Sequence, residues 1–158
     1  MRARFATTAL LTGACSSLAP SLSSQEAELA SVVERLRTER ASSREAFRVL
    51  PCDRAYESGP HSCYSEQVRA GDLAIGVVHF RPQRGRGAII QLEGVGPGCI
   101  RLEAMQSRFS GGSVRNSCDH GICRYYNVDG PSGRLSFGLP TSDQAPQCVT
   151  SVVLNFDG

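Results

Sequence analysis

Two hydrophobic periods divide the chain, a helical period before residue 63 and an alternating one after it. The helical period forms a stripe with steps of mostly three and four residues, typical of one face of an amphipathic helix: Leu29, Val33, Leu36, Phe47 and Leu50. Arg40 and Ser43 interrupt the stripe, and Pro51 ends it because its ring clashes with a preceding helical turn. We expect this helix to pack on the protein's own sheet. A coiled-coil face for a partner is the alternative, but it needs three or four uninterrupted heptads.

A capping box marks the expected start of the helix. In the run Ser23-Ser24-Gln25-Glu26, the Ser23 hydroxyl can accept a hydrogen bond from a free backbone amide, while the Glu26 carboxylate reaches back to the amide of Ser23. Glu26 and Glu28 also place negative charge at the positive end of the helix dipole, which stabilises the helix.

Short alternating runs after residue 63, separated by clusters of Gly, Pro, Asn and Asp, predict β-strands. The expected strands are residues 73–80, 88–92, 100–105, 113–118, 123–128, 134–139 and 148–156. Strands joined by short turns pair antiparallel. The expected fold class is therefore α+β, an N-terminal helix followed by an antiparallel β-sheet, either a sandwich or a partly open barrel, cross-linked by disulfides.

One strand register follows from the alternation. If residues 95–99 form a turn, the following pairs face each other across a hairpin, the first two buried and the third exposed: Leu92 with Leu102, Ile90 with Ala104, and Glu93 with Arg101. A slip by one residue would oppose apolar and charged side chains. We therefore interpret the glycines of residues 94–98 as turn glycines joining two strands, since a phosphate-binding loop needs a strand followed by a helix.

The cysteines indicate disulfides. Seven are present, six of them between residues 52 and 148. An even set in a small exported domain is typical of disulfide bonds. The spacing favours three pairs, Cys52 with Cys63, Cys118 with Cys123 and, for the remaining two, Cys99 with Cys148, among fifteen connectivities that six cysteines allow. Zinc held by Cys118, His120 and Cys123 is the alternative; a structural zinc site needs four ligands, so no metal is expected.

The first residues are typical of an export signal. Arg2 and Arg4 precede an apolar stretch at residues 5–11 and small residues at 12–14. This stretch is shorter than the roughly 20 apolar residues that cross a bilayer as a helix. We expect export to the periplasm.

The residues around Cys15 resemble the bacterial lipoprotein box, in which cleavage before a cysteine leads to lipidation of its thiol. Ala14 fits the pattern, whereas Leu11 lies one place too early and Thr12 stands where leucine is usual. The resemblance implies a lipid anchor on Cys15, a flexible tether at residues 16–24 and attachment to a membrane in the periplasm or at the outer membrane. Ordinary cleavage nearby, giving a soluble periplasmic or secreted protein, is the alternative.

One domain is expected after the signal and the tether. The predicted organisation is a signal peptide at residues 1–14, a tether at 15–24 and a single α+β domain at 25–158, which is close to the commonest domain size. The formal net charge of +2 is too small to indicate a nucleic-acid partner.

Catalysis in this chain would depend on its histidines, which are His61, His79 and His120. Imidazole titrates near neutral pH, so His61 and His120 are the candidate base and acid of a small secreted hydrolase or nuclease. Nothing in their spacing requires them to meet, and the sequence has no Gly-x-Ser-x-Gly nucleophile motif. His79 falls on an expected strand and is interpreted as a packed residue. The favoured hypothesis is a protein that is not an enzyme and has no cofactor.

Two arginine-containing segments are candidate binding loops. Arg81, Arg84 and Arg86 occur in an expected hairpin loop and suit carboxylates or phosphates, although a solvated surface loop is the simpler interpretation. Ser132-Gly133-Arg134 resembles the inserting loops of bacterial lysozyme inhibitors, which are small exported β-proteins; the resemblance covers three residues. The leading hypothesis is a non-catalytic binding or accessory module that contacts an anionic envelope component, or an envelope protein, through Arg81, Arg84, Arg86, Ser132 and Arg134.

Overall fold

The fold is described by a computed structural model for residues 22–38, 49–50, 54–55, 63–82, 87–116, 123–131, 133–141 and 146–157. Its elements in chain order are helix α1 (Ser24–Thr38), strands β1 (Arg54–Ala55), β2 (Cys63–Ala70), β3 (Leu73–Pro82) and β4 (Gly87–Gly96), helix α3 (Leu102–Arg108), and strands β5 (Ser113–Asn116), β6 (Arg124–Gly130), β7 (Gly133–Leu139) and β8 (Ser151–Asp157). This order confirms the predicted α+β class.

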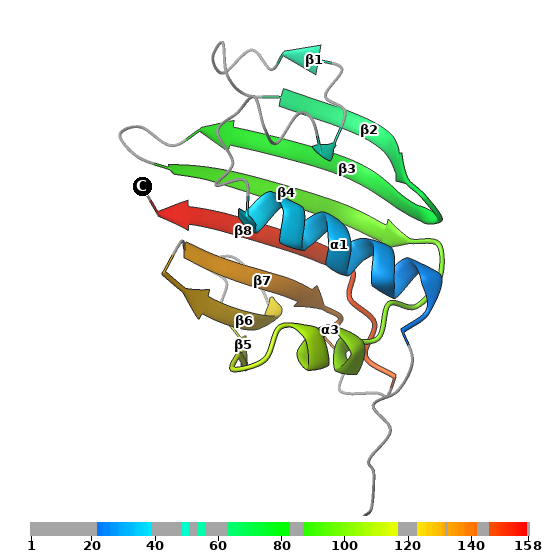
Figure 1. Cartoon of the computed structure of the whole chain (residues 1–158), viewed down its shortest axis with the longest axis vertical. Coiled ribbons are helices and arrows are strands. Elements are labelled where there is room, and N and C mark those ends of the chain that lie inside the picture. The colour runs from blue at the N-terminus through cyan, green and yellow to red at the C-terminus, as the bar shows by residue number, and fades with distance from the viewer. Residues whose placement is uncertain are drawn as a thin grey trace, which may run out of the picture.

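The eight strands form one antiparallel sheet in the order β1-β2-β3-β4-β8-β7-β6-β5. Strands β1–β4 and β5–β8 each follow one another as neighbours, and the two groups meet where β4 pairs with β8. Figure 1 shows the sheet as a curved layer with β1 at one edge and β5 at the other. The described strands form no second sheet and no closed barrel, so the open form of the predicted sheet is the one observed.

Helix α1 packs on one face of this sheet, as its apolar stripe predicts. Leu29, Val33 and Leu36 are fully buried in one cluster with inward residues of the strands, such as Ile90 and Leu92 of β4. Figure 1 shows α1 lying over β4 and β8, roughly along these strands. Burying each of these side chains stabilises the fold by about 1.5–3 kcal/mol. Leu50 is buried in the same cluster, so these four members of the stripe belong to the protein's own core, while Phe47 lies outside the described residues.

Residues 100–105 do not form the predicted strand, because this part of the chain continues into helix α3. Leu102, Met105 and Phe109 are buried, and their steps of three and four residues match a helix. The alternating interpretation used only the short run from Ile100 to Met105. So short a run does not distinguish a strand from a helix.

The predicted hairpin register is wrong for the same reason. Strand β4 pairs with β3 and β8 instead, and Leu92 lies opposite Val78 and Val152. The glycine-rich residues 94–98 do not join two strands either. Gly94 has a φ of 63° within β4 and approaches Gly76 of β3, after which the chain leads into α3.

Strand β2 is missing from the sequence prediction, because an extra residue disturbs its alternation. Ser65 and Val68 both face the core, although they are three residues apart. Gln67 lies between them with a φ of 54° and has no partner in the register of β2 with β3, as expected for a β-bulge. The strand is also rich in polar residues, and its inward residue Ser65 is itself polar, so no alternation of apolar and polar residues is visible in the sequence.

The predicted capping box is confirmed at the start of α1. The backbone N–H of Ser23 donates to Glu26 Oε2 at 2.7 Å, and the backbone N–H of Glu26 donates to Ser23 Oγ at 3.2 Å. Glu26 is the only charged side chain in the described part of the chain that is buried, with an exposed fraction of 0%. A carboxylate at this depth requires several hydrogen bonds.

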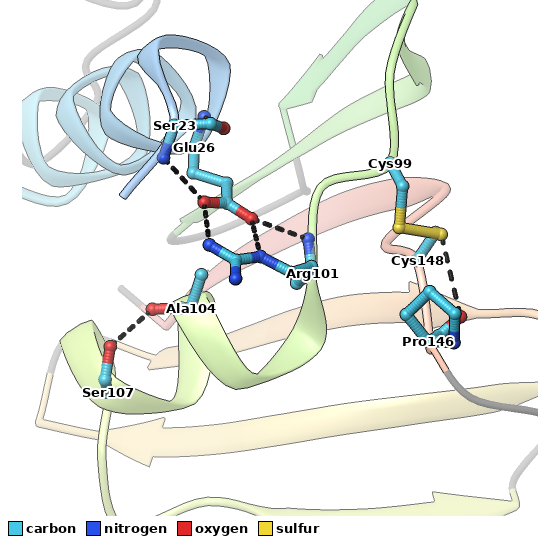
Figure 2. Close-up of polar contacts among 8 residues, drawn as sticks. All are labelled: Ser23, Glu26, Cys99, Arg101, Ala104, Ser107, Pro146 and Cys148. Carbon is cyan, nitrogen blue, oxygen red and sulfur yellow. Dashed lines mark hydrogen bonds and ion pairs between the residues drawn. A yellow bond between two sulfur atoms is a disulfide. The ribbon is translucent and has the colours of Figure 1, made fainter. Parts of the chain in front are cut away.

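Arg101 supplies the other partners of Glu26. The backbone N–H and Nε of Arg101 donate to Glu26 Oε1 at 3.1 and 2.7 Å, and Arg101 Nη2 donates to Glu26 Oε2 at 2.8 Å (Figure 2). These side-chain hydrogen bonds from Arg101 outweigh desolvation and lower the pKa of Glu26 from its usual 4.5 to about 2. The pair joins the N-terminus of α1 to the segment that begins α3.

A disulfide lies beside this pair. Cys99 and Cys148 are bonded across 49 residues of sequence, which confirms the third predicted disulfide (Figure 2). The backbone bond from Val149 N–H to the Ile100 carbonyl, 2.8 Å, continues the contact. Cys123 is also disulfide-bonded, while its predicted partner Cys118, together with Cys52 and the side chain of Cys63, lies outside the described residues.

We predict that Glu26→Gln lowers the free energy of unfolding by about 2 kcal/mol at pH 7. The lowered pKa corresponds to about 3 kcal/mol, and solvent reaching Arg101, whose side chain is 40% exposed, reduces this figure. Because the folded pKa is depressed, the contribution is complete above the unfolded value of about 4.5 and is lost as the pH falls toward 2. Urea titrations at pH 7 and pH 3 should show the difference from wild type shrinking by more than half.

Glu34→Gln is the matched control for this experiment. Glu34 Oε1 lies 2.7 Å from Arg108 Nε, the same separation as in the Glu26 pair, but its side chain is 41% exposed. An exposed pair of this kind contributes about 0–1 kcal/mol. Equal losses from the two substitutions, or a Glu26→Gln effect that does not change with pH, would contradict the assignment.

Removing the disulfide with the double substitution Cys99→Ala and Cys148→Ala should destabilise the protein by about 2–4 kcal/mol. In the loop-entropy account, closing a loop of this length restricts the unfolded chain by about that amount. Urea unfolding of the oxidised proteins provides the measurement. A variant with the unfolding midpoint and slope of wild type would show that this bridge contributes nothing to stability.

Candidate functional site

The face of the sheet opposite α1, called the open face below, carries the outward side chains of the strands. In β4, for example, Ala88, Ile90 and Leu92 are buried, whereas Gln91 is half-buried and Glu93 is exposed. This alternation is what a strand with one buried face requires. Both α1 and α3 contribute to the apolar cluster on the other side, so neither helix covers the open face.

Cross-strand pairing arranges the open face in three rows. The arginine row contains Arg81, Ile89, Asn155, Arg134 and Asp129. The middle row contains Tyr64, His79, Gln91, Val153, Ser136 and Asn127. The glutamate row contains Glu66, Val77, Glu93, Ser151, Gly138, Tyr125 and, on β5, Arg115. All of these residues except Gly138 are exposed or half-buried.

The structure places Arg81 and Arg134, candidates from two distant segments, in the same row. Strands β4 and β8 lie between them, so three inter-strand steps of about 4.8 Å separate their backbones by roughly 14 Å. Arg81 Nη2 donates to Gln91 Oε1 at 3.2 Å, and Arg134 Nε lies 2.6 Å from Asp129 Oδ1. Both guanidiniums are therefore oriented by a neighbour while remaining at the surface.

Arg81 belongs to strand β3 and not to the predicted hairpin loop, whereas Arg134 lies in β7, where the strand expected at residues 134–139 places it. Arg81 pairs with Ile89 in the β3–β4 hairpin. Gly130 pairs with Gly133 in the β6–β7 hairpin, so Arg134 is a strand residue. Arg84, Arg86 and Ser132 lie outside the described residues.

A polar network extends over β2, β3 and β4. The Tyr64 hydroxyl donates to Glu66 Oε1 at 2.6 Å, and the Tyr64 ring packs on the His79 ring with centroids 4.7 Å apart. Gln91 connects two charged neighbours, since it accepts from Arg81 and its Nε2 donates to Glu93 Oε1. These contacts hold the polar groups in set orientations before any ligand arrives.

A second network lies on β6 and β7. Ser136 Oγ donates to Asn127 Oδ1 at 2.6 Å. Gly138 stands opposite Tyr125, and a Cβ on Gly138 would lie 3.4 Å from Tyr125 Cε1 and 2.1 Å from Ser151 Oγ. The absence of a side chain at this position leaves room for the Tyr125 ring edge next to Gly138, and Tyr125 is half-buried.

A hollow of about 610 Å³ lies elsewhere, between the ends of α1 and α3 and the β6–β7 hairpin. Glu34 pairs with Arg108 across it, and the hydrogen bond that Arg108 donates to Glu34 raises the pKa of Arg108. The Arg37 guanidinium lies 5.9 Å from the centroid of the Phe109 ring. These contacts connect the two helices and cover the core at this end of the sheet.

The catalytic candidates His61 and His120 lie outside the described residues, as does the lipidation candidate Cys15. His79 lies on β3 in the middle row, where its ring packs on Tyr64. Within the described ranges, no three His, Cys, Asp or Glu side chains are grouped so that they can hold a metal ion. None of the helices in this part of the chain combines the length and apolar character needed to cross a membrane.

No protein-family model, curated protein or solved structure matches this chain. Its function is therefore argued from its own residues. Residue type indicated Arg81 and Arg134 in the sequence but not Gln91, Asn127 and Tyr125, which share the open face with them. The polar positions of the expected strands are the signal that could have identified them, once the strand order was known.

Proposed function

We propose that the protein is an exported, non-catalytic binding module of the bacterial cell envelope that holds an anionic envelope component on its open face. The observation that carries the proposal is the arginine row, in which Arg81 and Arg134 share one face and one end of the sheet. Guanidinium groups present planar, paired donors that suit carboxylates and phosphates. Two of them about 14 Å apart fit an extended polymer or a surface better than a single small ion.

The export signal and Cys15 supply the location in this proposal. A lipid on Cys15 and the short tether after it would keep the domain close to a membrane, where envelope polymers are concentrated. Weak binding by an exposed arginine row is then sufficient, because tethering raises the effective concentration of the ligand.

The double substitution Arg81→Gln and Arg134→Gln should weaken binding to bacterial envelope fragments by about tenfold or more. Each lost hydrogen bond to a charged group contributes about 1.5–3 kcal/mol. Wild-type binding should also weaken as salt rises, since exposed charges are screened beyond about 8 Å at physiological ionic strength. Co-sedimentation of the full chain carrying Cys15→Ala, which removes the anchor, measures binding by the domain itself.

Arg35→Gln is the matched control, because Arg35 is exposed on α1, away from the open face. It should leave binding unchanged. Arg81→Gln and Arg134→Gln should both leave folding unaffected. Arg81 is exposed, and Arg134 and its partner Asp129 are both more than half exposed. Salt-independent binding that survives the double substitution would contradict the proposal. An enzymatic activity lost with His61→Ala or His120→Ala would favour the hydrolase hypothesis instead.

The proposed anchor makes a separate prediction. Wild-type protein expressed in a Gram-negative bacterium should incorporate radiolabelled palmitate and sediment with membranes, and Cys15→Ala should abolish both because the thiol is the attachment point. Recovery of unlabelled soluble wild type would contradict lipidation. That result would leave the binding surface untouched, because the arginine row does not depend on the anchor.

A further inference from the structure

The open face carries acceptors as well as cations. Glu66 and Glu93 are exposed in the glutamate row, two rows from the arginines, and each already accepts one hydrogen bond from a neighbour, Tyr64 or Gln91. A carboxylate has room for further donors. The exposed cations Arg69 and Arg115 lie on the same side of this face. A ligand that carries both hydroxyl donors and negative charge matches this mixture of acceptors and cations.

The middle row, between the arginine row and the glutamate row, also contains groups that can form hydrogen bonds with hydroxyls. Gln91, Ser136 and Asn127 come from three strands, and the amides of the first and last provide both donors and acceptors. Their side chains are half-buried, and hydrogen bonds orient each of them. Such preorganisation reduces the entropy that a ligand loses on binding.

Tyrosine rings stand on the outer strands of this surface. Tyr64 lies on β2 and Tyr125 on β6, five inter-strand steps apart, which corresponds to roughly 24 Å. Tyr125 lies opposite Gly138, with one edge of its ring next to that glycine, and its side chain is half-buried. A flat ring with a polar tip suits a ligand that is apolar on one side and hydroxylated at its edge, as a sugar ring is.

A protein partner fits this face less well. The large hydrophobic side chains exposed in the described ranges are Leu22 and Val114, at 37% and 40%. Neither lies on the open face, since Leu22 precedes α1 and Val114 pairs with the inward residue Tyr126. Protein interfaces depend on a few well-packed apolar or aromatic residues near their centre. The centre of the open face is instead occupied by Gln91, Val153 and Ser136.

We infer that the ligand is an acidic glycan, a polysaccharide strand that lies across the strands on the open face. Its sugar rings stack on Tyr125 and Tyr64, its hydroxyls bond the middle and glutamate rows, and its carboxylates meet Arg81 and Arg134. This inference rests on the proposed function and names the chemistry of its ligand.

Two separated envelope materials test the inference, with the full chain carrying Cys15→Ala. The first is peptidoglycan, used as whole sacculi and as soluble glycan strands stripped of their peptides, which bear carboxylates. The second is vesicles of equal parts phosphatidylglycerol and phosphatidylcholine. We expect co-sedimentation with sacculi, competition by the stripped strands and little binding to vesicles.

Single substitutions on the open face test the individual contacts that the glycan is inferred to make. Tyr125→Ala should weaken sacculus binding about three- to tenfold, as expected for one stacked ring, while Tyr125→Phe should retain it. Gln91→Ala and Asn127→Ala should each weaken it about three- to tenfold. Gln106→Ala on α3 is the matched control and should have no effect. Circular dichroism and urea unfolding establish that each variant is folded.

The outcomes separate the inference from the proposed function. Binding to vesicles that depends on Arg81 and Arg134, without binding to sacculi, would overturn the inference that the ligand is a glycan. It would leave the proposed function, binding of an anionic envelope component, in place. Binding to sacculi that the stripped strands do not compete would also overturn the glycan and point to the peptides. Binding to envelope fragments but to neither material would point to a protein partner and overturn the glycan. Failure to bind envelope fragments at all would overturn both.

Discussion

The position of α1 on the sheet depends on one buried carboxylate. Glu26 accepts hydrogen bonds from the amides of Ser23 and Arg101 and from two nitrogens of the Arg101 guanidinium, so both of its oxygens are satisfied. A buried charge is costly unless it is paired in this way. The same carboxylate stands at the start of two helices, where the helix dipoles also favour it. With the Cys99–Cys148 bond beside it, this contact connects three parts of the chain that are distant in sequence.

Placing both helices on one side of a single sheet determines where binding can occur. The inward positions form one apolar cluster, which leaves the outward positions of six strands free to be polar. Strand order then brings together residues from separate hairpins. Arg81 and Arg134 are 53 positions apart in the sequence, and they share a row because β4 pairs with β8. The open face is thus a consequence of the join between the two groups of strands.

Local signals in the sequence were sufficient for some parts of the fold and not for others. The capping box at Ser23 and the helix after it could be predicted because their determinants lie within four residues of each other. The helix at Leu102 could not be predicted in this way, because its short apolar pattern fits both the helical and the strand period. Contacts with distant parts of the chain decide between the two. Strand β2 was hidden by the bulge at Gln67. For the site, residue type indicated Arg81 and Arg134, whereas the role of Gln91 depends on the register of β4 with β3 and β8.

The open face mixes positive and negative charges at both ends of its strands. Arg81 and Arg134 lie near the hairpin ends with Asp129 beside Arg134, and Glu66 and Glu93 lie toward Gln67 and Gly94. The exposed Arg69 and Arg115 lie on the same side as the two glutamates. A polymer with alternating hydroxyls and acidic groups finds a partner for each in this arrangement. Electrostatic complementarity of this kind gives specificity more than it adds affinity. The mixed charge that keeps the net value near zero is therefore compatible with selective binding of an acidic polymer.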